Sequence, residues 1–228
     1  MGSETVILEL YIIRHAQSAG NTEPSPGGKR DYPPDDPPLT ARGLIEAALV
    51  ADRMAHGRLD AVISSPLERA VNTAHEIAKR QSSLHVEILP DLMETDTAPG
   101  VTGCTAEILR AKYPLSLPCL DEPTPAGGTL AAVQEDFDAV SARAARCVNY
   151  VCSRFHSGER VALVTHGGFF GYILRCALGM PREELFRWSV NNSSVTKIKF
   201  YSDGTRKLSY SNDTSHLYSE SPDMTYTI

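Results

Sequence analysis

The chain is organised around Leu10-Tyr-Ile-Ile-Arg-His-Ala-Gln-Ser-Ala-Gly-Asn21, an apolar run that stops abruptly at Arg14 and His15. A bounded run of this kind, apolar from Val6 onward, predicts a strand that is covered on both faces in an α/β sheet. Ligands bind in the crevice beyond the carboxyl ends of such strands. The Arg-His pair therefore lies where a ligand site is expected, although the dipeptide alone fits a structural histidine equally well.

A second apolar run, 160–165, ends in the same way at His166. Gly167 and Gly168 follow it and precede a helical pattern. Glycine permits close backbone approach, and a helix N-terminus offers free N–H groups to an anion. Two strands that each deliver a histidine to one sheet edge therefore predict an anion site there.

A third strand-like run, 61–65, leads through Pro66 into a helical pattern that contains Arg69. Proline suits the first helical turn, and the serine before it suits the helix cap. Arg69 is therefore expected in the first turn of that helix, close to the same sheet edge.

Five separated segments resemble, in order, the motifs of the histidine phosphatase superfamily, which contains the phosphoglycerate mutase-like enzymes. They are Arg14–Asn21, Leu39–Gly43, Ser64–Ala70, Leu92–Glu94 and Val164–Gly168. The resemblance implies a three-layer α/β/α sandwich with a mostly parallel central sheet. It also implies a cap inserted at about 95–128, where substrate choice is expected.

Length and composition agree with one α/β domain over residues 1–228. The chain is 42% hydrophobic and 22% charged, and strands alternate with helices along it. The formal net charge of −6 argues against general nucleic-acid binding. A local basic pocket still attracts a small phosphorylated substrate, which is the partner we expect.

The cysteines and the N-terminus indicate a cytoplasmic protein. The five cysteines are odd in number and lack C-x-x-C spacing, which favours reduced thiols over a disulfide framework. No stretch approaches the ~20 apolar residues of a membrane span, and the N-terminus has no basic signal region.

Further elements follow from periodicity and turn residues. The pattern predicts helices from Thr40 to Gly57, over 105–112 and over 129–155, a strand over 86–92, and a closing hairpin of strands 184–192 and 195–201 around Asn191 to Ser194. The polar remainder to Ile228 is expected to be a weak strand or a tail. The proline-rich segment 24–38 predicts a loop, which is either solvated or in contact with substrate.

The proposed chemistry follows from what a phosphate monoester requires. A neutral imidazole supplies a lone pair at physiological pH without a metal or cofactor, so His15 is the expected nucleophile and becomes phosphohistidine. Arg14 and Arg69 are expected to hold the phosphate oxygens, with His166 as a further donor. The resemblance adds Asn21 as a supporting contact. The Gly167 backbone is included among the substrate-binding positions.

The leaving alkoxide needs a proton, and the attacking water then needs a base. Glu94 fits both roles, because a neighbouring phosphate anion favours its protonated form. Its motif is short and the glycine-rich sequence that often follows it is not obvious, so Asp96 is the reserve candidate.

The sequence is consistent with three functions. A metal-independent phosphomonoester hydrolase is preferred. A phosphoglycerate-type mutase is disfavoured because the chain lacks the Arg-His-Tyr-Gly pattern of glycolytic mutases after Glu94. A regulatory module that binds a phospholigand with little catalysis is the third possibility.

Overall fold

The computed structural model describes residues 5–22, 36–82, 84–95, 97, 101–118, 135–181 and 188–218. Within them, seven strands form one sheet in the order β4-β3-β2-β5-β1-β6-β7. The strands are β1 (Val6–Arg14), β2 (Ala61–Ser64), β3 (Val86–Ile88), β4 (Ser116–Pro118), β5 (Glu159–Thr165), β6 (Val195–Tyr201) and β7 (Arg206–Asp213). The helices are α1 (Ala41–Ala55), α2 (Glu68–Lys79), α3 (Ala106–Lys112), α4 (Phe137–Arg154) and α5 (Gly167–Leu178), with short 3-10 turns η1 (Ala19–Asn21), η2 (Pro90–Leu92) and η3 (Ser215–Leu217).

The first five strands of the chain run parallel, and β6 and β7 add an antiparallel edge. In the register, Arg14 lies opposite Thr165, and Ser64 lies opposite Val164. Strands β1, β5 and β2 therefore end at nearly the same level. His15, His166 and Ser65, which come next in each segment, are brought to one edge of the sheet.

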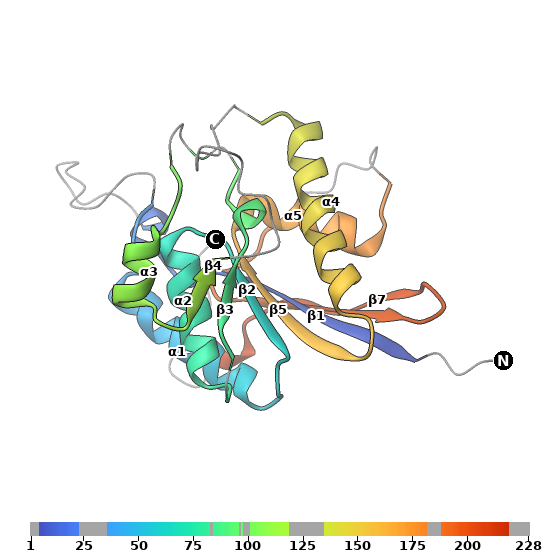
Figure 1. Ribbon diagram of the computed structural model, residues 1–228, viewed down its shortest axis with the longest axis horizontal. Coiled ribbons are helices and arrows are strands. Elements are labelled where there is room, and N and C mark those ends of the chain that lie inside the picture. The colour runs from blue at the N-terminus through green and yellow to red at the C-terminus, as the bar shows by residue number, and fades with distance from the viewer. Residues whose placement is uncertain are drawn as a thin grey trace.

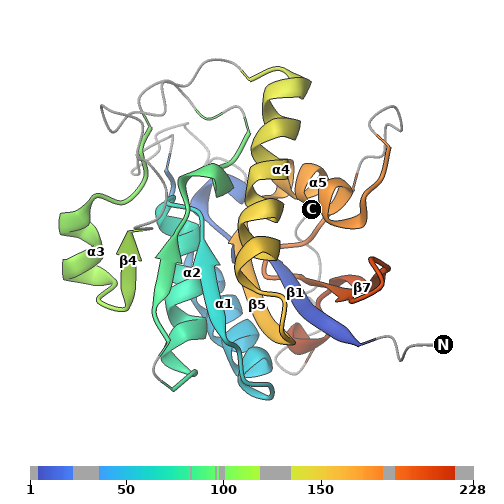
Figure 2. The ribbon, with the colours of Figure 1, turned by 45° about the vertical axis from the view of Figure 1, so that its right-hand side comes forward.

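Helices cover both faces of the sheet. Figures 1 and 2 show α1 and α2 on one face and α4 and α5 on the other. Alternate residues of β1 serve the two faces: Leu10 and Ile12 pack with α4 and α5, whereas Tyr11 and Ile13 pack with α1 and α2. This confirms the predicted three-layer sandwich and explains why β1 is apolar on both sides.

The C-terminal hairpin differs from the prediction. Strand β6 pairs with β7, and Gly204, at φ 87°, lies in the turn between them. Residues 188–192 form no strand, while 184–187 lie outside the described residues. The prediction was misled because 191–194 looks like a turn, and because β7 is an edge strand with mostly exposed, polar residues.

Other boundaries also move. Helix α4 begins at Phe137 with Asp136 as its cap, so the predicted unbroken helix over 129–155 is wrong at 135–136. The predicted start at 129 lies outside the described residues. The predicted strand 86–92 is β3 followed by η2, because Pro90 begins a helical turn. Within the predicted cap, α3 matches the expected helix, and 116–118 extend the sheet as β4. The cap itself stays a prediction.

Two findings concern the surface and the thiols. None of the helices in the described ranges is long and apolar enough to cross a membrane. The described cysteines are Cys104, Cys147, Cys152 and Cys176, and all are free. Cys147 is buried and the other three are partly exposed.

Candidate active site

His15 follows directly from β1 and is 3% exposed. Its Nδ1 lies 2.7 Å from the carbonyl oxygen of Ala16, and its Nε2 lies 3.3 Å from Nε of Arg69. A carbonyl only accepts and a guanidinium only donates. Both contacts therefore require the same neutral form of His15, with the proton on Nδ1 and a lone pair on Nε2.

His166 follows β5 in the same way and is fully buried. Its ring centroid lies 5.1 Å from that of His15, and its Nε2 lies 2.7 Å from Oγ of Ser65. Its Nδ1 is buried and has no hydrogen-bond partner within the described residues. The ring therefore keeps one nitrogen to offer to a group bound beside His15.

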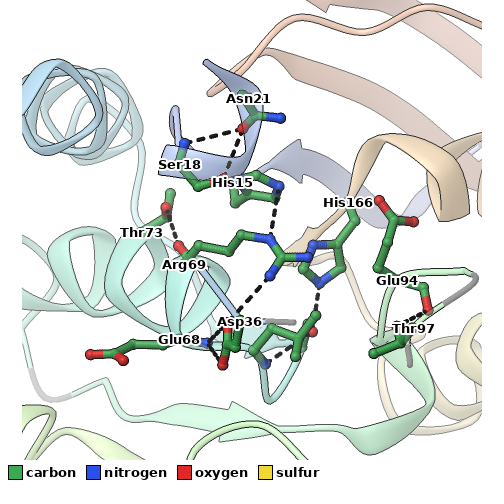
Figure 3. Close-up of polar contacts among 12 residues, drawn as sticks. His15, Ser18, Asn21, Asp36, Glu68, Arg69, Thr73, Glu94, Thr97 and His166 are labelled. Atoms are coloured by element: carbon green, nitrogen blue, oxygen red, sulfur yellow. Dashed lines mark hydrogen bonds and ion pairs between the residues drawn. The ribbon is translucent and has the colours of Figure 1, made fainter. Parts of the chain in front are cut away.

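Arg69 is the second residue of α2 and lies in the first turn, as predicted. Figure 3 shows its guanidinium between His15 and Asp36, whose Oδ1 lies 3.2 Å from Nη1. The Asp36 carboxylate also accepts the backbone N–H of Glu68 at 2.9 and 3.0 Å. Asp36 therefore caps α2 and orients Arg69 at the same time.

Sequence reasoning assigned the α2 cap to Ser65 and missed Asp36. The structure has Leu67 at the cap position without a side-chain cap, whereas Ser65 Oγ contacts His166 and accepts the N–H of Leu67 at 3.3 Å. Asp36 belongs to the proline-rich segment 24–38, far from α2 in the sequence, so no local spacing marks it.

Arg14 ends β1 and points toward the start of α5. Its Nη1 donates to the carbonyl of Val190 at 2.5 Å, while its Nε is buried without a hydrogen-bond partner in the described part of the chain. A Cβ on Gly167 would lie 3.2 Å from that Nε. The absence of a side chain at Gly167 thus keeps the space beside Arg14 open.

Burial and the two arginines set the charge of the histidines. Desolvation lowers the pKa of His15 well below 6.5, and the neighbouring Arg69 and Arg14 lower it further. The pKa of His166 falls well below 6.5 for the same first cause, followed by Arg69 and His15. Both imidazoles are therefore neutral at physiological pH, and the fixed positive charge of the site comes from the guanidinium groups.

Glu94 is held at the N-terminus of α5. Its Oε2 accepts the N–H of Gly168 at 3.1 Å, and its Oε1 accepts the N–H groups of Phe169 at 2.8 Å and Thr95 at 2.9 Å. We expected free N–H groups at this helix end, and that expectation is wrong for Gly168 and Phe169. The carboxylate acts instead as a distant cap that satisfies two amides of the first turn.

Asn21 mainly supports the loop after β1. Its Oδ1 accepts from the backbone N–H of Ser18 at 3.1 Å, from Ser18 Oγ at 3.0 Å and from Nδ2 of Asn192 at 3.2 Å. Asn192 also donates to the carbonyl of His15 at 3.0 Å. Asn21 therefore helps to fix the backbone of His15, and its predicted contact with substrate stays a prediction.

Other predicted positions fall outside this description. Asp96, the reserve acid, lies outside the described residues, as does the part of the proline-rich segment from 24 to 35. Across the ranges that are described, no group of three or more His, Cys, Asp or Glu side chains is placed to hold a metal ion.

Comparisons with known proteins identify relatives along most of the chain. A family model described as histidine phosphatase superfamily (branch 1) matches residues 10–213. A protein of Mycobacterium tuberculosis named as bifunctional is 29% identical over 219 residues, or 95% of this chain. The chain spans 57% of the length of that relative. A probable phosphoglycerate mutase of Salmonella choleraesuis is 28% identical and covers 85% of this chain and 86% of its own.

A solved structure is also similar. Phosphoserine phosphatase from Entamoeba histolytica, in a mutant form bound to phosphoserine, superposes with a TM-score of 0.62 at 21% identity. The match covers 92% of this chain and 99% of that chain. At this identity the likeness concerns the fold, which agrees with the sheet order and helix layers described above.

Proposed function

Because the chain belongs to the histidine phosphatase superfamily, we propose that it is a phosphomonoester hydrolase that acts through a phosphohistidine on His15. The observation that carries this proposal is the pair of contacts made by the His15 ring, which fit one neutral tautomer. Its Nδ1 is tied to the carbonyl of Ala16 at 2.7 Å, which leaves a lone pair on Nε2. The low pKa of the ring keeps that lone pair available.

In the first step, Nε2 of His15 bonds to phosphorus and the bond to the ester oxygen breaks. Arg69, whose Nε lies 3.3 Å from Nε2, donates to the phosphoryl oxygens instead. Arg14 Nε and His166 Nδ1, both buried without protein partners in the described residues, supply further donors. Phosphoryl transfer depends mainly on such positioning and charge stabilisation.

Glu94 is proposed to move the protons. In its acid form it protonates the departing alkoxide, and as the carboxylate it then takes a proton from the water that attacks phosphohistidine. The second step releases inorganic phosphate and restores His15. The N–H groups of Gly168 and Phe169 hold the Glu94 carboxyl group at the N-terminus of α5, which supports this role.

The substrates are proposed to be small phosphorylated molecules. The Entamoeba histolytica enzyme binds phosphoserine, and its fold resembles this one. Metal independence is part of the proposal, because two guanidinium groups beside neutral imidazoles supply the positive charge.

The relative named a probable phosphoglycerate mutase favours a second candidate, a phosphomutase. A mutase must protect phosphohistidine until the substrate reorients, whereas a phosphatase admits water. Isomerisation of phosphoglycerate without release of inorganic phosphate would select the mutase.

We expect the parent protein to hydrolyse p-nitrophenyl phosphate with EDTA present, and His15→Ala to lose at least about 10³-fold in kcat. The exposed His85 provides a matched control, and His85→Ala is expected to keep parental activity. Acid-quenched reactions with labelled substrate should trap acid-labile phosphate on the parent only.

Several outcomes separate the candidates. Equal activity in the parent and His15→Ala, or label on serine or cysteine, would remove His15 as the nucleophile. Tight binding of phosphate without turnover would select the regulatory module.

A further inference from the structure

The segment that carries Glu94 is held by an arginine from another layer of the fold. Arg143, on α4, is 3% exposed. Its Nη1 donates to the carbonyl oxygens of Asp91 at 2.9 Å and Met93 at 2.6 Å. Met93 immediately precedes Glu94, so the backbone leading into Glu94 is tied to α4.

The carbonyl between those two is held from β5. Thr165 Oγ1 donates to the carbonyl of Leu92 at 3.1 Å, and Thr165 immediately precedes His166. Three successive carbonyls before Glu94 are therefore fixed by buried side chains. A backbone held in this way leaves Glu94 little freedom beyond its own side-chain rotations.

Arg143 also contacts the residue that holds the Glu94 carboxylate. Its Cζ lies 4.1 Å from the centroid of the Phe169 ring, and the N–H of Phe169 donates to Glu94 Oε1 at 2.8 Å. Its remaining edge pairs with Glu135, with Nε at 2.8 Å and Nη2 at 2.5 Å from the carboxylate oxygens. One guanidinium thus fixes both the segment that presents Glu94 and its hydrogen-bond partner.

A buried arginine is costly unless its donors are satisfied, and here each of the three guanidinium nitrogens has an acceptor. Purely structural packing between α4 and the sheet needs only apolar side chains, which the rest of the buried face of α4 supplies. Only the planar guanidinium group of arginine can contact two carbonyls, a carboxylate and an aromatic ring at the same time. Arg143 holds the carbonyl of Met93, the residue directly before the proposed acid, which indicates that these contacts serve Glu94.

We propose that Arg143 is a positioning residue for Glu94, fixing the carboxyl group at the distance and angle required for proton transfer. The proposal rests on the proposed function. A positioning role differs from a structural role in one measurable way. If Arg143 positions Glu94, the loss of kcat on replacing Arg143 depends on how much the leaving group needs a proton.

The test compares phenyl phosphate with p-nitrophenyl phosphate, whose leaving group needs little protonation. We expect Arg143→Met to lower kcat on phenyl phosphate by about 10²-fold, the scale of a misplaced catalytic group, and on p-nitrophenyl phosphate by much less. Arg143→Lys keeps the charge but loses the planar guanidinium group. Its kcat on phenyl phosphate is expected to lie between those of the parent and of Arg143→Met. In a Glu94→Gln background, Arg143→Met should cost less than about twofold, because the two residues act as a unit.

Arg154→Met is the matched control. Arg154 lies in the last turn of the same helix and pairs with Glu87 at 2.7 and 3.0 Å, away from Glu94. The Arg154→Met variant is expected to keep the parental kcat on both substrates. Thermal unfolding should be measured for every variant, and Arg143→Lys carries the comparison if Arg143→Met does not fold.

Equal losses on the two substrates, or losses that multiply with Glu94→Gln, would show a structural role and overturn the inference while leaving the phosphatase intact. A parent protein inactive on both substrates would overturn the proposed function and the inference together.

Discussion

Gly168 lies where any side chain would strike the proposed acid. A Cβ built there would lie 2.7 Å from Glu94 Oε1 and 2.5 Å from Thr95 Oγ1. The glycine therefore has a packing reason that is independent of backbone conformation. It lets the first turn of α5 approach Glu94 closely enough to donate its N–H.

Gly168→Ala is expected to lower kcat on phenyl phosphate by about 10²-fold, because the new methyl group displaces Glu94 from its amides. Stability should change little, since alanine favours the helix by about 1 kcal/mol and offsets part of the local strain. Steady-state kinetics and urea unfolding measure the two effects.

Gly171→Ala is the control on the same helix. Its Cβ would have a ring carbon of Trp188 at 3.4 Å as its nearest neighbour, which is tolerable packing. Parental kinetics are expected for it. A Gly168→Ala enzyme with parental kcat on phenyl phosphate would show that Glu94 is not held as described.

The residues that the sequence predicted at the candidate site lie at or shortly after the carboxyl end of a parallel strand. His15 and His166 each follow a buried strand, and Arg69 begins a helix after a third strand, so parallel topology alone predicts their proximity. Asp36 and Arg143 contact residues that are distant from them in the sequence, and no local sequence pattern marks these contacts. The sequence therefore did not predict the roles of these two residues.

At the scale of elements, α1 depends on one close approach. Gly43, in its first turn, is buried, and a Cβ there would overlap the backbone carbonyl of Gln17. The same helix supplies Glu46, whose Oε2 accepts the N–H of Gln17 at 2.8 Å. The start of α1 is thereby locked against the segment that follows His15.

Gly43→Ala is expected to destabilise the fold by about 1–3 kcal/mol, the usual cost of overpacking, although alanine is the better helix former. The free energy of urea unfolding measures this, with Gly171→Ala again as the control. A stabilised Gly43→Ala protein would contradict the close approach.

Element prediction worked where burial produces a clear period. Helix α1 begins after Thr40 and α3 after Thr105, both as expected, because each threonine accepts an N–H of the first turn. The strand over 195–201 was predicted, but its partner was placed on the wrong side because β7 is exposed and carries no alternating apolar pattern. The start of α4 was missed because Leu130 and Val133 continue its apparent period. Edge strands and helix ends depend on neighbours that periodicity does not record.

At the scale of the whole molecule, buried neutral histidines make stability depend on pH. Burial is the first cause of the lowered pKa of His15, His75 and His166, and it lowers that of His216 to about 4. Below about pH 6.5 the unfolded chain binds protons that the folded protein does not. The contribution of these neutral histidines to the free energy of unfolding is therefore fully present above that pH. It falls as the pH drops, by up to about 1.4 kcal/mol per pH unit for each histidine.

Urea unfolding between about pH 5.5 and 7.5 is expected to show this loss on the acid side. Burial raises the pKa of Asp36 above 3.8 and that of Glu46 above 4.5, so these two carboxyl groups favour the folded state as the pH falls and oppose the histidine effect. His15→Gln should reduce the slope of this dependence, because it removes one of the four histidines with a lowered pKa, while replacement of the exposed His85 by Gln should not. A flat parental profile would contradict neutral burial.

The strand order also determines when β1 can pair with its neighbours during synthesis on the ribosome. Strand β1 emerges first, yet within the described sheet it pairs only with β5 and β6, which are synthesised late. The nascent chain must therefore carry this apolar strand without either neighbour until Thr165 has been translated, and without β6 until Tyr201 has been translated. Truncated products that end before β5 lack both partners of β1 and leave its backbone N–H and C=O groups unpaired, so we expect them to aggregate more readily than the full chain.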